Sequence, residues 1–171
     1  MEEETMKLTL QSLSSKAFTE FGHVCVVPPT DKPEHSCDEF DWWPDRILFD
    51  SITGKYGAGF AKIKRSPFRQ KCSERHMKTP EFLLPVNGDM ILILGPPEYP
   101  NEPSRLPDFS RFAAFKIKAG EAVLLKPGVW HYAGMPFEDE IYMYCIYASG
   151  TGENDLALVD FPNGTVLEVD I

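Results

Sequence analysis

The chain has 171 residues, which fits one domain (1–171) with a sizeable core, and its 43% apolar and 25% charged residues are ordinary for a soluble globular protein. Its formal net charge of −9 argues against non-specific binding to nucleic acid or to an anionic membrane, because both need clustered lysine and arginine. We therefore expect neither nucleic acid nor a membrane as a partner.

The four cysteines are widely spaced and form no CxxC pair, so a zinc-knuckle motif has no basis. The acidic start MEEETMKLTL lacks the apolar segment of a signal peptide, and no apolar run approaches the length of a membrane span. These features predict a cytoplasmic protein with reduced thiols.

The first part of the chain predicts a loose tail at 1–6, followed by a short apolar–polar segment. Ser14 or Ser15 can cap a short helix that runs through Phe21, and Gly22 is suited to end it.

Fifteen prolines and twelve glycines predict many turns between short elements. Proline-rich loops are expected at 28–44 and 96–107, and the last two strands flank a tight turn at Asn163 and Gly164. We expect strands at 23–27, 46–49, 56–65, 89–94, 112–117, 122–125, 141–147, 156–161 and 165–169. About ten short strands without a βαβ rhythm predict an all-β fold, a β-sandwich or barrel with one short helix near the start.

The stretch CSERHMKTPEFLLPVNG, at 72–88, holds the densest set of chemically useful side chains. In an extended segment, Glu74 and His76 share a face because they are two residues apart. The break at Lys78-Thr79-Pro80 lets the chain turn, so that Glu81 could return on the adjacent strand. A carboxylate, an imidazole and a second carboxylate that converge inside a β structure indicate a metal site or an acid–base site.

Two segments resemble the conserved motifs of the cupins. Gly120, five residues, Lys126-Pro127-Gly128, two residues and His131 resemble the second motif, whereas His76, four residues, Glu81, six residues and Gly88 are similar to the second half of the first. The first motif normally opens His-x-His, and Glu74 stands in the place of its first histidine. The resemblance implies a cupin-type β-sandwich or jelly-roll barrel.

Within the cupins, the chain looks most like the ureidoglycolate lyase family. The likeness runs in the family's order through Ala17-Phe18, Phe21-Gly22, Arg65, Glu74-Arg75-His76, Phe82, Pro85, Gly88, Phe115 and Gly128-Val129-Trp130-His131. At the position of Glu81 this family often carries glutamine. The likeness implies cleavage of ureidoglycolate to glyoxylate and urea in a homodimer, as a step of allantoin catabolism in purine metabolism.

The implied reaction needs a base for the hydroxyl proton and an acid for the leaving nitrogen. We assign His76, His131 and Glu74 as catalytic. The ligands of one divalent first-row ion (Ni, Zn, Mn or Fe) would be Glu74, His76, Glu81 and His131, and no organic cofactor is expected. Candidate substrate-binding residues are Arg65, Arg75, Trp130 and Tyr132, with Arg65 preferred because alternation directs Arg75 to the opposite face.

Other interpretations stay open at this stage. The chain could be a small-molecule-binding cupin without turnover, or another metal-dependent cupin enzyme such as an isomerase or a dioxygenase. Glu74 could instead be a surface ion-pair partner, and the Lys62-Lys64-Arg65 cluster could be a solvated strand face. The strand at 141–147 could also contact a second subunit.

Overall fold

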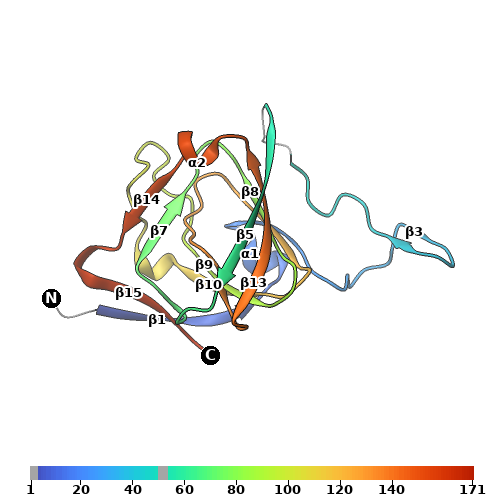
Figure 1. Ribbon diagram of the computed structural model, residues 1–171, viewed down its shortest axis with the longest axis horizontal. Coiled ribbons are helices and arrows are strands. Elements are labelled where there is room, and N and C mark those ends of the chain that lie inside the picture. Colours follow the sequence, from blue (N-terminus) through green and yellow to red (C-terminus); the bar gives the residue numbers. More distant parts are fainter. Residues whose placement is uncertain (1–3, 50–53) are drawn as a thin grey trace.

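The computed structural model describes residues 4–49 and 54–171 (Figure 1). The described chain is mostly strand, with two four-residue helices, α1 (Ser15–Phe18) and α2 (Thr151–Asn154). The first strands are β1 (Glu4–Ser12), β2 (Gly22–Cys25), β3 (His35–Ser36), β4 (Asp41–Trp42), β5 (Tyr56–Lys64), β6 (Arg69–Gln70), β7 (Cys72–Arg75) and β8 (Glu81–Pro85). The remaining strands are β9 (Met90–Leu94), β10 (Ala113–Ile117), β11 (Ala122–Leu125), β12 (Met135–Pro136), β13 (Glu140–Ala148), β14 (Ala157–Asp160) and β15 (Thr165–Asp170), with 3-10 turns at Phe109–Arg111 and Pro162–Gly164.

Two large sheets form the body. One has the order β12-β9-β10-β1-β15-β6 and the other β2-β11-β8-β13-β5, while β14 pairs with β7 and β3 with β4 in two small ribbons. The sheets curl around the interior (Figure 1), which confirms the predicted all-β fold of packed sheets with a short helix near its start.

Two apolar clusters stabilise this arrangement. One gathers around α1, where Phe18, Phe21 and Phe115 meet edge to face with ring centres 5.1 to 5.9 Å apart. The other contains the fully buried Trp130. All five residues of β9 are buried and contribute to both clusters, as expected for a continuous apolar run bounded by Gly88.

The prediction of a loose tail at 1–6 is wrong for residues 4–6, and 1–3 lie outside the described residues. Strand β1 begins at Glu4 and lies in the middle of its sheet, parallel to both β10 and β15. The alternating Met6, Leu8 and Leu10 fit a strand, but its place at the centre of the sheet depends on long-range pairing. The helix is predicted correctly at its start, where Ser14 accepts a hydrogen bond from the Ala17 amide, but it ends at Phe18.

Three other expectations need correction. The segment 46–49 forms no strand, because it follows Pro44 and a left-handed backbone at Asp45 (φ 52°). The segment 28–44 is not loop throughout, since it carries the β3–β4 hairpin on an arm that projects from the sheets (Figure 1). The last two strands do not form a hairpin, because β14 pairs with β7 and β15 with β1 and β6.

Candidate active site

The backbone places Glu74 and His131 side by side. Glu74 lies on β7, and each residue donates its amide to the carbonyl of the other, at 2.7 and 2.8 Å. Directly opposed residues of an antiparallel pair direct their side chains to the same face. The turn before His131 depends on Gly128, whose φ of +83° is the left-handed conformation that glycine adopts without strain.

His76 follows the end of β7 and completes a cluster with these two residues. Ligand atoms of Glu74, His76 and His131 lie within 4.8 Å of one another, and both histidines are buried. The rings of His76 and His131 have centres 5.3 Å apart. The predicted shared face of Glu74 and His76 is therefore present.

Glu81 reaches the cluster from the five-stranded sheet, whereas Glu74 reaches it from the β7–β14 ribbon. It opens β8, which pairs with β11 and β13 in the five-stranded sheet, so the prediction of a strand adjacent to β7 is wrong. Its Oε2 lies 2.9 Å from Nε2 of His131 and 3.8 Å from Nε2 of His76. All four predicted ligands thus converge, although from two different sheets.

Main-chain carbonyls orient both imidazoles. Nδ1 of His76 donates to the Asp155 carbonyl at 2.6 Å, and Nδ1 of His131 donates to the Val129 carbonyl at 3.0 Å. A carbonyl can only accept, so each ring carries its proton on Nδ1 in the neutral form and directs a bare Nε2 into the cluster. Asp155 is further fixed because its carboxylate accepts the amides of Met77 and Lys78.

The electrostatics of the cluster favour an ionised pair. Burial by itself raises the pKa of Glu81, but the neighbouring imidazoles of His131 and His76 outweigh it, and the pKa is lowered. Burial opposes the charged form of His131 too, yet Glu81 and Glu74 raise its pKa above the ordinary value.

The pair nevertheless lacks a well-formed hydrogen bond. Although the two atoms are 2.9 Å apart, Glu81 Oε2 and His131 Nε2 are both buried without a hydrogen-bond partner of good geometry among the described residues. Buried polar atoms are rarely left in this state. A nitrogen and an oxygen donor oriented toward a common region, beside His76 and Glu74, fit a divalent cation of borderline softness.

A cavity of about 340 Å³ opens onto the cluster. Glu74, Glu81, His131 and Tyr132 form its polar part, and the apolar part is lined by Ala61, Ile63, Leu83, Ala133, Met143 and Cys145. This volume lies within the range of small-ligand sites, which are largely apolar with a few polar groups. Tyr132 is the one predicted substrate-binding residue that lies there.

Arg75, a predicted substrate-binding residue, lies outside the cavity. Its side chain is fully buried, and its guanidinium lies 4.5 Å over the ring of Trp130. The guanidinium donates to four carbonyls of the loop 96–107, those of Glu98, Tyr99, Glu102 and Pro103, at 2.6 to 3.2 Å. Alternation along β7 had indicated this opposite face.

Trp130 and Arg65 are also absent from the cavity. Trp130 has no exposed surface and packs in the second core cluster, because alternation places it opposite His131. Arg65 is exposed just past the end of β5, with its guanidinium 3.9 Å from the Asp139 carboxylate. Sequence reasoning missed Asp155, and no local signal could have found it, since it is 79 positions from the ring that it orients.

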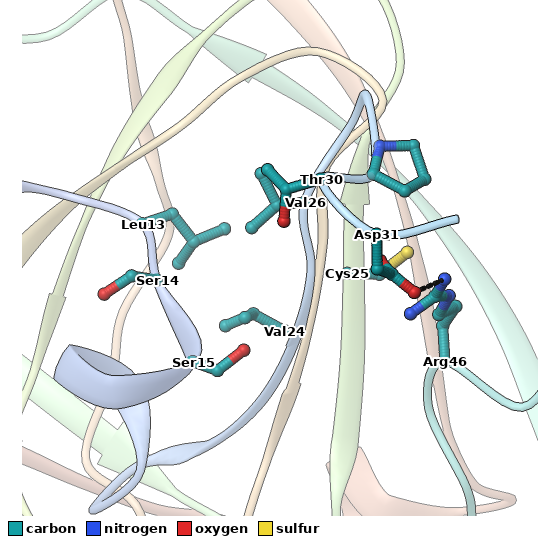
Figure 2. A pocket seen from close by; sticks show the side chains of 10 residues that line it. Leu13, Ser14, Ser15, Val24, Cys25, Val26, Thr30, Asp31 and Arg46 are labelled. Carbon is teal, nitrogen blue, oxygen red and sulfur yellow. Dashed lines mark hydrogen bonds and ion pairs between the residues drawn. The ribbon is translucent and has the colours of Figure 1, made fainter. Parts of the chain in front are cut away.

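A second hollow, of about 290 Å³, lies between α1, β2 and the base of the arm (Figure 2). Its charged groups are Asp31 and Arg46, which satisfy each other at 2.7 Å, and Leu13, Val24 and Val26 form much of its wall. Among the described residues, the grouped metal-ligating side chains are those of Glu74, His76 and His131, and none of these lines this hollow.

The sequence model of the family described as ureidoglycolate lyase matches residues 5–168, nearly the whole chain. The chain belongs to the ureidoglycolate lyase family. This assignment confirms the resemblance based on the two motifs, and the same segments contain the four residues whose side chains converge in the cluster. No curated protein matches the sequence. Over the described residues, no helix is long and apolar enough to cross a membrane.

Solved structures with a similar fold are remote in sequence. Oxalate decarboxylase of Bacillus subtilis, a protein with Mn(II) centres, is 13% identical at a TM-score of 0.40, over 61% of this chain and 23% of that one. NovW, a 4-keto-6-deoxy sugar epimerase of Streptomyces spheroides, is 12% identical at a TM-score of 0.46, and the match covers 67% of this chain and 60% of NovW. RmlC of Streptococcus suis, solved with dTDP-D-xylose, is 9% identical at a TM-score of 0.41, and the match covers 56% of this chain and 44% of RmlC. The chain thus spans about a quarter to three fifths of the length of these proteins.

Proposed function

We propose that this member of the ureidoglycolate lyase family cleaves ureidoglycolate to glyoxylate and urea with the help of one divalent metal ion. The family match supports the reaction class. The observation that carries the proposal is the buried pair of Glu81 Oε2 and His131 Nε2, which lie 2.9 Å apart without a good hydrogen bond, at the cavity that also holds Glu74.

The residues that would hold the ion are Glu74, His76, Glu81 and His131. Two imidazole nitrogens and two carboxylate oxygens suit Ni, Zn, Mn or Fe in the divalent state. When bound, such an ion would chelate the carboxylate and hydroxyl of the substrate and lower the pKa of that hydroxyl. The Asp155 and Val129 carbonyls hold the two imidazoles in the tautomer that a ligand requires.

The proton transfer is assigned to Glu74. Its side chain is 27% exposed, against 13% for Glu81 and 6% for His131, so it is the cluster's group most open to an incoming substrate. One carboxylate oxygen of Glu74 takes the hydroxyl proton as the carbonyl of glyoxylate forms. The electron pair of the breaking C–N bond stays on the nitrogen, and the same proton is passed to that nitrogen, which gives neutral urea.

The apolar wall of the cavity supports this chemistry. Leu83, Met143 and Cys145 keep water away from the buried side of the cluster, which strengthens the interaction of Glu81 with both histidines. Burial raises the pKa of Cys145 to about 12, so this thiol stays protonated and takes no part as a nucleophile.

A homodimer is proposed through β5, the edge strand of the five-stranded sheet. Phe60 on its outer face is 57% exposed and meets Tyr144 of β13 with ring centres 5.2 Å apart. An exposed edge with aromatic side chains is suited to pair with a second copy. Light scattering should show a dimer for the wild type and a monomer for Phe60→Glu, whereas an unchanged mass of the variant would contradict this interface.

The experiment for the reaction combines metal content with turnover. Protein purified without chelator should contain about one equivalent of one divalent metal and release glyoxylate and urea from ureidoglycolate in equal amounts. His131→Ala should lose the metal and at least about 100-fold in activity, the usual scale for an acid–base or ligand residue. His23→Ala is the matched control, because His23 is exposed on β2. Wild-type protein that binds ureidoglycolate without turnover would overturn the proposal.

A further inference from the structure

A third hollow, of about 510 Å³, adjoins the cavity at His131. The two share four lining residues, which are Ala61, Ile63, Tyr132 and Ala133. We call the 510 Å³ hollow the side chamber. It lies between β5, β6 and the segment that follows His131, so a molecule seated at the catalytic cluster can extend into it past Tyr132.

Three of the residues that line the side chamber, Lys62, Lys64 and Arg69, are cationic, and their positions on the strands place their charges at its rim. On β5, Ile63 is buried, so alternation directs Lys62 and Lys64 to the opposite, outer face. Lys62 pairs there with Glu140 at 2.7 Å. On β6, Arg69 is exposed and lies 3.1 Å from Glu168.

The uncharged polar residues that line the side chamber are Ser66, Gln70 and Tyr132, and Gln70 is the buried one among them. This side chain is 4% exposed, and its Nε2 is buried without a hydrogen-bond partner among the described residues. The rest of the inner wall is largely apolar, with Ala61, Ile63 and Met135. A buried amide donor without an acceptor is costly to the fold, and such groups are found where a ligand supplies the missing partner.

The pairing of the charges at the rim favours a neutral ligand group. A carboxylate would need a free cation beside it, whereas Lys62 and Arg69 are already held by Glu140 and Glu168. A neutral carbonyl needs only the donor that Gln70 offers. We propose that the side chamber is the subsite for the ureido end of the substrate, and that Gln70 Nε2 donates to the ureido carbonyl oxygen. This inference rests on the proposed lyase function and adds a specificity-determining residue to it.

The contact would act on the reaction as well as on binding. When the C–N bond breaks, its electron pair moves to the ureido nitrogen and is shared with the carbonyl oxygen until the proton arrives. A donor on that oxygen stabilises the transition state more than the ground state. Tyr132, which lies between the cavities, would set the width of the passage for this end of the substrate.

The test replaces Gln70 by methionine, which keeps length and volume and removes the amide. The matched control is Gln11→Met, since Gln11 is the other glutamine of the chain and is exposed on β1. Calorimetry would measure two probes, N-carbamoylglycine, which has a carboxylate and a ureido group, and glycolate, which has no ureido group. Neither probe requires turnover.

We expect Gln70→Met to bind N-carbamoylglycine about 5- to 10-fold more weakly, the scale of one hydrogen bond, with unchanged glycolate binding and a melting temperature no lower than that of the wild type. Equal loss for both probes, or no loss for either, would overturn the inference. Wild-type protein that binds N-carbamoylglycine through Gln70 but does not cleave ureidoglycolate would support the subsite while it refutes the lyase proposal.

Discussion

Replacement of Arg75 by methionine tests whether this residue holds the proline-rich loop rather than the substrate. The guanidinium is fully buried and donates to four main-chain carbonyls of the loop 96–107. Burial lowers the pKa of Arg75 from a very high ordinary value, and the side chain stays charged. Loss of these bonds should release the loop, since its carbonyls can then only bind water.

The magnitude follows from the geometry. Four hydrogen bonds at a net contribution of about 1 kcal/mol each stabilise the fold by roughly 4 kcal/mol. Their loss is partly offset in the variant, because methionine does not bury a charge. We expect about 3 kcal/mol of lost stability, which corresponds to a decrease in melting temperature of roughly 6–12 °C for a domain of this size. Lysine at the same position should be intermediate, because a single ammonium cannot span the four carbonyls.

The assay is thermal unfolding of Arg75→Met combined with limited proteolysis of the loop 96–107. Arg65→Met is the matched control, because Arg65 is exposed and its guanidinium lies 3.9 Å from the Asp139 carboxylate. This substitution should change the free energy of unfolding by less than about 0.5 kcal/mol. If Arg75→Met melts with the wild type and its loop is cut no faster, the anchoring role is refuted.

Two further predictions concern titratable side chains. Iodoacetamide at pH 8 should label the exposed Cys37 and leave Cys145 unmodified, because the pKa of Cys145 is about 12; equal labelling rates by mass spectrometry would contradict this. Burial raises the pKa of Asp89, but the bonds from Lys116 and from the Ala119 amide lower it overall. The ionised Asp89 carboxylate therefore stabilises the fold at neutral pH, and this stabilisation is lost as the pH falls below about 4. Asp89→Asn should lower the free energy of unfolding in urea by about 1 kcal/mol at pH 7 and leave it unchanged near pH 2. A constant difference across this range would refute the pairing.

Much of the architecture was predictable from local sequence. The apolar run that becomes β9, the aromatic run of β13 and the glycine turn before His131 each carry their structure in a few neighbouring residues. The motif spacing was also sufficient to name the four side chains that converge. These signals are local because burial of one face, and the φ that a turn requires, restrict which residue types occur at neighbouring positions.

Pairing partners and side-chain roles required the tertiary structure. The sequence by itself predicted that Glu74, His76, Glu81 and His131 would converge and that the chain is an all-β member of its family. Only the fold decided that Glu81 arrives from the opposite sheet, that β1 lies at a sheet centre and that Arg75 holds a loop. The reason is physical: side-chain periodicity records how deeply a strand is buried, whereas its neighbours are selected by contacts across the whole chain.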